Sequence, residues 1–346
     1  MLHDVLIVGA GIAGLTLARE LRARGHSPIV LERARGVGGR CATRRIFEQP
    51  VDHGLAFLHG RGASFLAELD ALADPHKIPG WPRTWDGDGT PCQPVAFDGQ
   101  SRRLALASGV SRFAKHLAHG SDVRLSHEVT GIRMLPSPDR VWELSLTSGE
   151  TLRAPCVALT MPASSVGALL KAMDPVPAEI AAILPLLDLV HLLPCLTVIA
   201  RYPPGTAAPA WDASFPRASA AIQTILHDSS KRPGPERVVL VIQARPRFSR
   251  VHLENLVVSW THELLEEAAA LHGHWVAQPE IVQSHIWRKA RVAPGSQLTQ
   301  PLAVKLDSGA VLGIAGDGLH AAGGVEGAYL SGLALAARFR EMRLHI

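Results

Sequence analysis

A glycine-rich turn close to the N-terminus constrains the fold more than any other part of this 346-residue chain. Residues 5–8 (VLIV) form a continuous apolar run, which is typical of a parallel strand buried on both faces. The sequence GAGIAG follows at residues 9–14, and residues 15–24 then show the apolar spacing of a helix. Residues 28–31 (PIVL) indicate a second strand that ends at Glu32. This order predicts a dinucleotide-binding βαβ unit.

The glycines of this turn have separate physical tasks. Gly9 permits the tight turn, Gly11 lets the backbone approach a pyrophosphate, and Gly14 lets the helix pack close to the strand. The pyrophosphate would accept hydrogen bonds from free N–H groups at the start of the helix. The predicted contacts are Gly9, Gly11, Ile12, Ala13 and Gly14. Glu32 would accept hydrogen bonds from a ribose diol. The alternative is a tight strand–helix turn that binds no ligand.

Composition excludes several classes of protein. Hydrophobic residues make up 47% of the chain and charged residues 19%, which favours a sizeable core over disorder. No basic run indicates nucleic-acid binding, and no stretch of about 20 unbroken apolar residues indicates a membrane span. The four cysteines form no CxxC pair, and His272-Gly273-His274 has no thiol or carboxylate cluster beside it, so no metal site is predicted. The first strand leaves no room for a signal peptide, and we expect a cytoplasmic protein.

The residues after the second strand narrow the choice of dinucleotide. GVGGR at residues 36–40 continues from that strand, and the whole run resembles the FAD fingerprint of the amine-oxidase and phytoene-desaturase superfamily. The resemblance implies that Gly38, Gly39 and Arg40 lie along the FAD pyrophosphate and ribityl chain. Glycines suit a loop that passes under a flat cofactor because they have no Cβ, and arginine supplies charge and forked donors. Arg33 would either edge the adenosine or face water.

A second flavin motif is predicted near the C-terminus. Residues 311–315 (VLGIA) indicate a buried strand, GDG follows at 316–318, and GGVEGA at 323–328 opens a helix. This run resembles the C-terminal flavin motif of the same superfamily. The resemblance implies that Asp317 bonds the ribityl or pyrophosphate region and that the helix start faces the flavin N1/O2 edge, where it would favour the charge of reduced flavin. The implied contacts are Gly316, Asp317, Gly324, Val325, Glu326 and Ala328, with the backbone of Val129 against the adenine. An ordinary strand–glycine–helix connection is the alternative.

Together the motifs predict an α/β fold. It would combine a Rossmann-like, glutathione-reductase-type FAD-binding domain with a mixed-sheet α+β substrate domain. Because the two flavin motifs lie at opposite ends of the chain, the FAD-binding domain should be discontinuous, with residues 1–64, 100–162 and 286–346. The substrate domain would consist of residues 65–99 and 163–285.

Three further segments resemble the renalase-like branch of the FAD-dependent amine oxidase superfamily. They are VDHG at residues 51–54, DSSKRPG at 228–234 and IWR at 286–288. The resemblance implies an FAD-dependent oxidase that takes hydride from a small substrate, such as dihydronicotinamide dinucleotide isomers, to flavin N5. O2 would then accept the electrons. Direct hydride transfer needs no strong base, so the protein would supply positioning and electrostatics.

The sequence departs from the renalase pattern at two places where the substrate would bind. Lys289 follows Trp287-Arg288 where the branch commonly has an aromatic residue, and Gln243 replaces a common histidine. Gln243, Trp287 and Lys289 are therefore the candidate catalytic residues. Trp287 would either wall the pocket or fill core, and Lys289 would either position a water beside N5 or lie on the surface. The pattern of residues 281–288 indicates a strand that ends at Arg288.

Two other functions stay open. Flavin amine oxidases often hold the substrate amine between two aromatic rings, but this chain has only two tyrosines, Tyr202 and Tyr329, so Trp or Phe would have to replace them. A flavin-binding protein without oxidase turnover is the third possibility, and the substitutions at Gln243 and Lys289 keep it open. Oligomeric state has no signature in the sequence.

Overall fold

The computed structural model describes residues 2–46, 49–136 and 139–342. The chain divides into two compact units, each assembled from separate stretches. The first unit contains Met1–Gly39, Phe113–Leu192 and Val292–Ile346, and the second contains Arg40–Arg112 and Leu193–Arg291. These bounds differ from those of the predicted domains, because residues 40–64, 100–112 and 286–291 lie in the second unit and residues 163–192 in the first. Which unit serves the cofactor and which the substrate stays a prediction at this point.

A six-stranded sheet organises the first unit, in the order β19–β20–β13–β1–β2–β9. Its strands are β1 (Val5–Val8), β2 (Pro28–Glu32), β9 (Asp122–Leu125), β13 (Cys156–Leu159), β19 (Leu302–Lys305) and β20 (Val311–Ile314). All neighbours pair in parallel except β19, which is antiparallel to β20. The central strands are buried on both faces, as their apolar runs predict. The Rossmann-like fold class is therefore confirmed.

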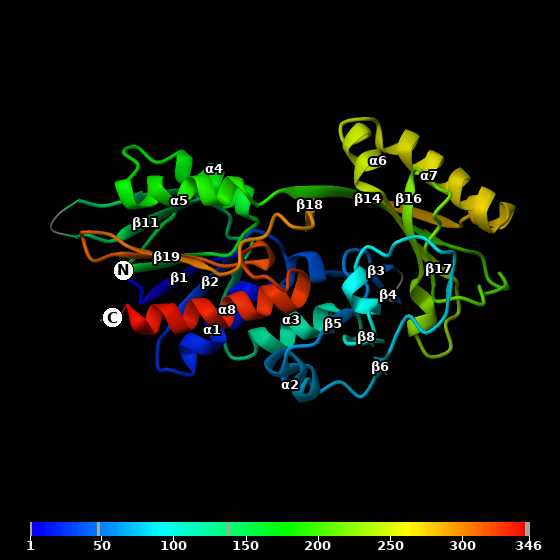
Figure 1. The fold of residues 1–346 in the computed structure, drawn as a ribbon, viewed down its shortest axis with the longest axis horizontal. Helices are drawn as coiled ribbons and strands as arrows, with labels where there is room; N and C mark the ends of the chain where they lie inside the picture. The colour runs from blue at the N-terminus through cyan, green and yellow to red at the C-terminus, as the bar shows by residue number, and fades with distance from the viewer. Residues whose placement is uncertain (1, 47–48, 137–138, 343–346) are drawn as a thin grey trace. The chain divides into compact units, whose positions relative to one another are not determined.

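Helices α1 (Ile12–Arg22) and α8 (Gly324–Glu341) lie side by side in this unit (Figure 1). A glycine permits their close approach, since a Cβ on Gly332 would stand 2.6 Å from the carbonyl oxygen of Ala13. The first and last helices of the chain are thereby packed together, which places both predicted flavin motifs in one unit. Helix α3 (Ser111–Ala118) begins where the chain passes from the second unit to the first, at residues 112 and 113.

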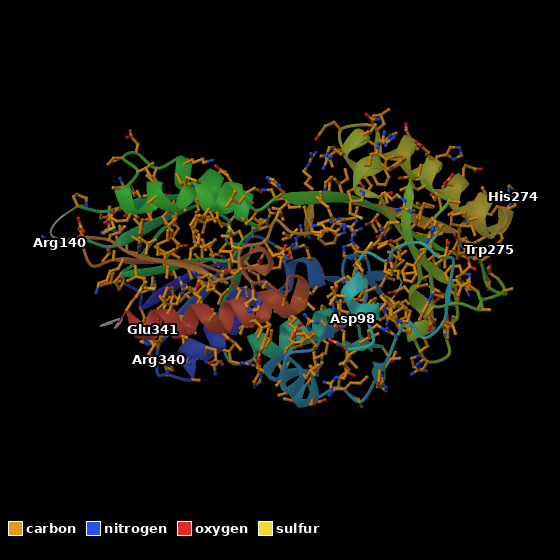
Figure 2. All side chains as sticks on the ribbon, in the orientation of Figure 1. Asp98, Arg140, His274, Trp275, Arg340 and Glu341 are labelled. Carbon is orange, nitrogen blue, oxygen red and sulfur yellow. The ribbon has the colours of Figure 1, made fainter. Side chains whose placement is uncertain are left out.

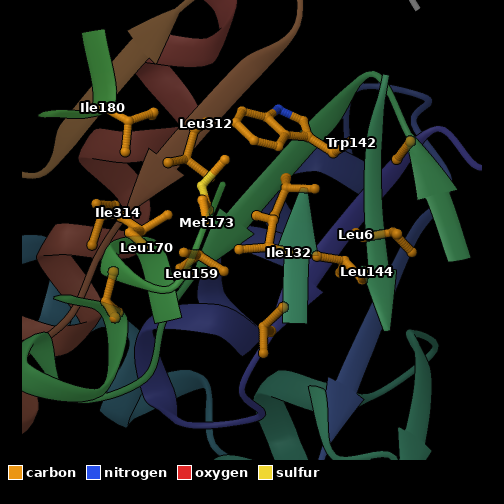
Figure 3. Packing of buried hydrophobic residues seen from close by; sticks show 14 of the residues in the cluster. Leu6, Ile132, Trp142, Leu144, Leu159, Leu170, Met173, Ile180, Leu312 and Ile314 are labelled. Carbon is orange, nitrogen blue, oxygen red and sulfur yellow. The ribbon is translucent and has the colours of Figure 1, made fainter. Parts of the chain in front are cut away.

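A second layer of the first unit explains the shifted domain bounds. It contains the sheet β10 (Val129–Met134), β11 (Trp142–Leu146) and β12 (Thr151–Ala154), with helices α4 (Ala163–Lys171) and α5 (Ala178–Asp188). Leu170 and Ile180 of the helices join the same apolar cluster as Leu6, Trp142 and Leu312 (Figure 3). Because residues 163–192 bury their apolar side chains in this core, they belong to the first unit rather than to the second.

The second unit has its own six-stranded sheet, in the order β18–β14–β17–β16–β15–β7. Its strands are β7 (Trp85–Asp86), β14 (Leu192–Arg201), β15 (Ala213–Ser214), β16 (Ile222–His227), β17 (Val239–Ala244) and β18 (Ile281–Val292). The pairings of β14 with β17 and β16 with β17 are antiparallel, whereas β15 pairs with β7 in parallel, so the sheet is mixed as predicted. Helices α6 (Pro246–Val251) and α7 (Val257–His272) accompany it.

The two faces of this sheet have different coverings. Leu196 and Ile242 pack into one apolar cluster with Trp260 of α7. Ile199 and Val241 point to the other face and pack into a second cluster. The remaining elements of the unit are β3 (Thr43–Ile46), β4 (Gln49–Asp52), β5 (Leu58–Gly60), α2 (Ala63–Ala71), β6 (Lys77–Pro79) and β8 (Arg102–Leu106). Strand β3 pairs with β4, and β8 pairs with both β5 and β6.

The turn after α7 contains His274 and Trp275 (Figure 2). The indole N–H of Trp275 donates to the carbonyl of His272 at 2.9 Å, and its ring contacts Tyr202 at 4.8 Å between centroids. His272 instead hydrogen-bonds Ser214, with 3.0 Å between Nε2 and Oγ. No helix in the described ranges is long and apolar enough to cross a membrane.

Candidate functional site

The turn between β1 and α1 has the properties that a bound pyrophosphate requires. A Cβ on Gly14 would stand 2.1 Å from the carbonyl oxygen of Gly9, so that position must lack a side chain. A Cβ on Gly11 would meet nothing within 4 Å. No side chain caps the start of α1 at Ile12, so its first N–H groups have no side-chain acceptor. Open space beside Gly11 and uncapped amides fit a phosphate group.

Glu32 connects this turn to the end of β2. Its carboxylate accepts hydrogen bonds from the N–H groups of Ala10 and Ala34, each at 2.8 Å. Each carboxylate oxygen keeps a further lone pair, which a ribose hydroxyl can use. The N–H of Gly38 donates to the carbonyl of Ala10 at 2.8 Å, so the second glycine pair lies against the first. The side chain of Arg33 is exposed.

The C-terminal motif lies in the same unit. The N–H of Gly316 donates to Ser331 Oγ at 3.1 Å, which holds the end of β20 against α8. Asp317, half-buried, begins the 3-10 helix η5 (Asp317–Leu319). Helix α8 then begins at Gly324 without a side-chain cap, after Gly323 in a left-handed conformation with φ of 60°. Val325 and Glu326 are buried in its first turn, and Ala328 is half-buried.

The predicted cofactor residues therefore collect in one unit with one exception. Gly39 and Val129 also lie in the first unit, where Val129 begins β10. Arg40 is the first residue of the second unit. Open space at one helix start and uncapped amides at two helix starts fit an FAD. The contacts of single residues with the cofactor stay predictions.

In the second unit, strand β18 divides its side chains between two environments. On one face, Ile286 packs against the α7 cluster, Ser284 hydrogen-bonds Thr261 at 2.8 Å, and Arg288 pairs with Glu254 at 3.1 Å. Because strand side chains alternate, the opposite face carries every second residue. These residues are Gln283, His285, Trp287, Lys289 and Arg291, and we call this set the inner face of β18.

Trp287 packs against the segment that follows β4. Its indole N–H donates to the carbonyl of His53 at 3.2 Å, and its ring lies 5.1 Å from the His53 ring and 4.2 Å from the His285 ring. A Cβ on Gly54 would approach Trp287 Cζ2 to 3.0 Å and the carbonyl oxygen of Arg40 to 2.4 Å. Glycine at position 54 is therefore needed for the indole to lie there.

Both histidines beside Trp287 are held neutral. Burial, together with the neighbouring Arg44 and His285, lowers the pKa of His53 to about 3. Burial and the charge of Arg44 likewise lower the pKa of His285 to about 4. Arg44 Nη2 lies 2.8 Å from His285 Nδ1, and since arginine can only donate, Nδ1 accepts. The neutral His285 ring therefore carries its proton on Nε2.

Gln243 reaches the same segment from β17. Its Nε2 donates to the carbonyl of Gly54 at 2.7 Å, and its Oε1 accepts from the thiol of Cys92, with 3.8 Å between the two heavy atoms. Thr197 and Thr224 stand opposite Gln243 on the neighbouring strands. The structure thus brings Gln243 and Trp287 onto one segment, His53-Gly54. Lys289 is half-buried on the inner face of β18.

Three members of this group were not predicted from the sequence, namely Arg44, Cys92 and Arg291. Cys92 hydrogen-bonds both Gln243 and Arg291, and Arg44 bonds His285, whose ring packs against Trp287. Alternation from Trp287 could have indicated Arg291, but residues 281–288 alone were expected as strand. Nothing in the local pattern marks Arg44 or Cys92.

A buried network of ion pairs holds Asp52, the residue that precedes His53. Lys231 is fully buried, with Nζ 2.6 Å from Asp52 and 2.5 Å from Asp228. Arg232 pairs with the same two carboxylates, at 3.4 and 3.1 Å. Burial alone would raise the pKa of Asp52, but Lys231 and Arg232 outweigh it and hold that pKa below its ordinary value. Two of the segments that resemble the renalase-like branch, 51–54 and 228–234, therefore contact each other.

Comparison with known proteins decides the family. The NAD(P)-binding Rossmann-like domain profile matches residues 7–69, and the flavin containing amine oxidoreductase profile matches residues 93–339. The chain belongs to the flavin containing amine oxidoreductase family. It is accordingly a flavoprotein, and its cofactor is FAD. The prediction of the superfamily is confirmed; the renalase-like branch stays a prediction.

Individual relatives are similar over shorter stretches. The putative flavin-containing monoamine oxidase AofH of Mycobacterium tuberculosis is 43% identical over 84 residues, which is 24% of this chain and 18% of that protein. Nicotine dehydrogenase of Pseudomonas putida is 40% identical over 67 residues, or 19% of this chain and 14% of that protein. The match thus spans less than a fifth of either relative's length.

Solved structures resemble the chain over nearly its whole length. Putrescine oxidase bound to putrescine superposes with a TM-score of 0.71 at 15% identity, covering 99% of both chains. A putative protoporphyrinogen oxidase from Exiguobacterium superposes with a TM-score of 0.72 at 14% identity, again over 99% of both. At such identities the likeness shows the shared fold.

Proposed function

We propose that this flavoprotein is a renalase-like oxidase that takes hydride from dihydronicotinamide dinucleotide isomers and passes the electrons to O2. The observation that carries the proposal is the charge around the inner face of β18. Arg44 bonds His285 at one end of this face and Arg291 stands at the other. No carboxylate occupies a position on the inner face itself. A substrate with phosphate groups would be attracted to such a face.

The neighbouring titratable groups do not cancel this charge. His53 and His285 are neutral because their pKa values fall to about 3 and about 4. Asp52 and Asp228, the nearby buried carboxylates, are compensated by Lys231 and Arg232. The field around Trp287 therefore favours anions and opposes an ammonium group.

The positions of the two tyrosines also argue against a pair of tyrosine rings that holds a substrate amine. Tyr202 is buried in the cluster on the α7 side of the sheet, and its hydroxyl donates to the carbonyl of Val276 at 2.9 Å. Tyr329 lies in α8 of the first unit. Neither side chain is on the inner face of β18, where Trp287 and His285 supply the flat rings. These rings suit a planar nicotinamide by stacking.

Bound FAD supplies N5 as the hydride acceptor. The residues of the second unit would position the dihydropyridine ring and exclude water while its carbon–hydrogen bond breaks. The substrate loses two electrons and becomes NAD(P)+, and O2 with protons takes up the electrons as hydrogen peroxide. The histidines have no role as bases in this step, because hydride transfer removes no proton from the carbon.

Amine oxidation is the second candidate function. It is supported by the family match and by the fold shared with proteins named putrescine oxidase and cyclohexylamine oxidase. An amine would have to bind uncharged near Arg44 and Arg291, which would shift its activity to high pH.

The two candidates differ in what reduces the flavin. The purified yellow protein is mixed anaerobically with 2- and 6-dihydro isomers of NAD(P) and, separately, with putrescine, cyclohexylamine and benzylamine. Rapid bleaching by the isomers, followed by one hydrogen peroxide per turnover in air, is expected. Bleaching by amines alone contradicts the proposal. Bleaching by neither would favour a flavin-binding protein without turnover.

A further inference from the structure

We propose that Arg291 anchors a negatively charged oxygen group of the substrate, a phosphate or a carboxylate. The inference rests on the proposed function, because it assigns a binding partner to one end of the inner face of β18. It names a residue that determines which substrates bind rather than one that takes part in hydride transfer.

The guanidinium of Arg291 is shielded from solvent without being satisfied. Its Nε and Nη2 atoms are buried and have no hydrogen-bond partner in the described part of the chain. Buried N–H donors that are left unpaired cost about 1–3 kcal/mol each, and more when they belong to a charged group. An uncompensated group of this kind in a native fold calls for an explanation.

The surroundings of Arg291 contain no counter-charge. The groups that act on its guanidinium are the thiols of Cys92 and Cys195, and Cys92 hydrogen-bonds it. Gln243, which contacts Cys92, is neutral. No ion pair between Arg291 and a carboxylate occurs among the residues that the structure describes. A guanidinium with two nitrogens that lack an acceptor matches the two oxygens of a carboxylate or phosphate.

The same unit contains a buried arginine with a structural role, which can be compared with Arg291. Arg232 is buried too, but it pairs with Asp52 and Asp228 and donates to the carbonyls of Pro50 and Leu106 at 3.1 and 3.0 Å. Its charge is thus compensated, and each of its three guanidinium nitrogens has a partner within the protein. Arg291 differs in both respects, which points to a partner from outside the chain.

The position of Arg291 on the strand suits a substrate with a ring and an anion. Trp287, Lys289 and Arg291 follow one another on the inner face, about 6.6 Å apart along the strand. A flat ring beside Trp287 would leave its charged group directed along the strand toward Arg291. Dinucleotides carry phosphates in this relation to the nicotinamide; simple amines carry no such group.

The test compares two faces of one strand. Arg291→Gln removes the charge, and Arg291→Lys keeps the charge but loses the fork. Arg288→Gln is the matched control, since Arg288 lies on the opposite face and is exposed in its pair with Glu254. Binding of inorganic pyrophosphate and of benzoate to each FAD-loaded protein is measured by titration calorimetry, and KM and kcat are measured with whichever substrate reduces the flavin.

Arg291→Gln should weaken binding of at least one of the two anions, and raise KM, by about 10- to 100-fold with little change in kcat. Arg291→Lys should recover part of the affinity, and Arg288→Gln should match the wild type. Loss of pyrophosphate affinity alone identifies a phosphate, and loss of benzoate affinity alone identifies a carboxylate. The inference is overturned if the wild type binds neither anion, or if Arg288→Gln weakens binding as much as Arg291→Gln.

Stability separates a binding role from a structural one. If the charge of Arg291 is uncompensated without substrate, Arg291→Gln should leave the melting temperature of the anion-free protein unchanged or raise it. A clear fall in melting temperature, with Arg291→Lys restoring it, would show a structural arginine and overturn the inference. Anion binding that depends on Arg291 in a protein that dihydronicotinamide isomers do not reduce would contradict the proposed substrate and leave this inference standing.

Discussion

Gly11 and Gly14 belong to the same turn but are needed for different reasons. A Cβ at position 14 would stand 2.1 Å from the Gly9 carbonyl oxygen and 2.5 Å from Thr160 Oγ1, and the backbone cannot move away cheaply. A Cβ at position 11 would enter open space. Folding therefore requires that position 14 lack a side chain, whereas the predicted contact with the cofactor requires the same of position 11.

This difference predicts opposite outcomes for two alanine variants. Gly14→Ala should cost about 2–4 kcal/mol of stability or abolish folding, because it forces strand and helix apart. Gly11→Ala should fold with nearly wild-type stability when stripped of FAD, but bind FAD at least about tenfold more weakly. Thermal unfolding of the stripped proteins and fluorescence titration with FAD measure the two effects. Equal FAD affinity in Gly11→Ala and wild type would contradict the predicted role.

His53 should make stability depend on pH. Its pKa is about 3 in the folded protein, and an unfolded chain binds the same proton with a pKa of about 6.5. The unfolded state therefore holds more protons between these values, so the contribution of the neutral ring is complete above about pH 6.5 and is lost as the pH falls toward 3.

The corresponding variant is His53→Gln. Between pH 6 and about 4, the wild-type free energy of unfolding should fall more steeply than that of the variant, by up to about 1.4 kcal/mol per pH unit. Urea unfolding at a series of pH values measures the slopes. Parallel curves for the two proteins would show that His53 is not the titrating group.

Among the elements, strand β4 and the 3-10 helix η3 (Asp228–Lys231) depend on each other through charge. The N–H of Asp52 donates to Asp228 Oδ1 at 3.2 Å, and Lys231 bridges both carboxylates and donates to the carbonyl of Ala56 at 3.1 Å. The segment that contacts Trp287 begins at the next residue, His53. The network therefore determines where that segment lies.

Removing one cation from this network should be costly. Lys231→Met should lower the free energy of unfolding by about 3–5 kcal/mol, because it leaves two buried carboxylates short of a partner. Lys171→Met is the control: Lys171 pairs with Asp188 at 2.9 Å on the surface, and its loss should cost about 0–1 kcal/mol. Denaturant unfolding of both variants compares them. Similar losses would mean that the buried network contributes no more than a surface pair.

Strand β18 shows where prediction of an element ended too early. The predicted strand stopped at Arg288, whereas the structure continues it to Val292. The extension places Lys289 and Arg291 on the same face as Trp287. The sequence pattern does not reveal this because the strand is half-buried at every position except Val282 and Arg288 and lacks a clear alternation of apolar residues.

At the scale of the whole molecule, both units are discontinuous, and the cofactor motifs come together only in the first. Loss of FAD should therefore loosen the first unit most. Hydrogen exchange of the FAD-loaded and stripped proteins should differ most in the first turns of α1 and α8, while β16 and β17 of the second unit should change little. Equal loss of protection in α7 would argue against the assignment of the cofactor to the first unit.

Local sterics determined what the sequence could reveal by itself. The order of strand, glycine turn, helix and acid from Val5 to Glu32 depends on contacts between near neighbours, and it appears in the structure where it was predicted. The family profile confirms the cofactor class that followed from it. A motif of this kind can be recognised because a few residues meet all of its steric demands.

Only the tertiary structure decided how the second unit arranges its polar side chains. Gln243 and Trp287 contact one segment at His53-Gly54, although that segment lies 189 and 234 residues away from them in the chain. Packing between strands that are distant in sequence leaves two donor nitrogens of Arg291 without an acceptor. Strand register and burial determine these contacts and the pKa of each histidine, and the local sequence predicts neither register nor burial. The glycine turn therefore indicates the cofactor, whereas our proposal for the substrate depends on the inner face of β18.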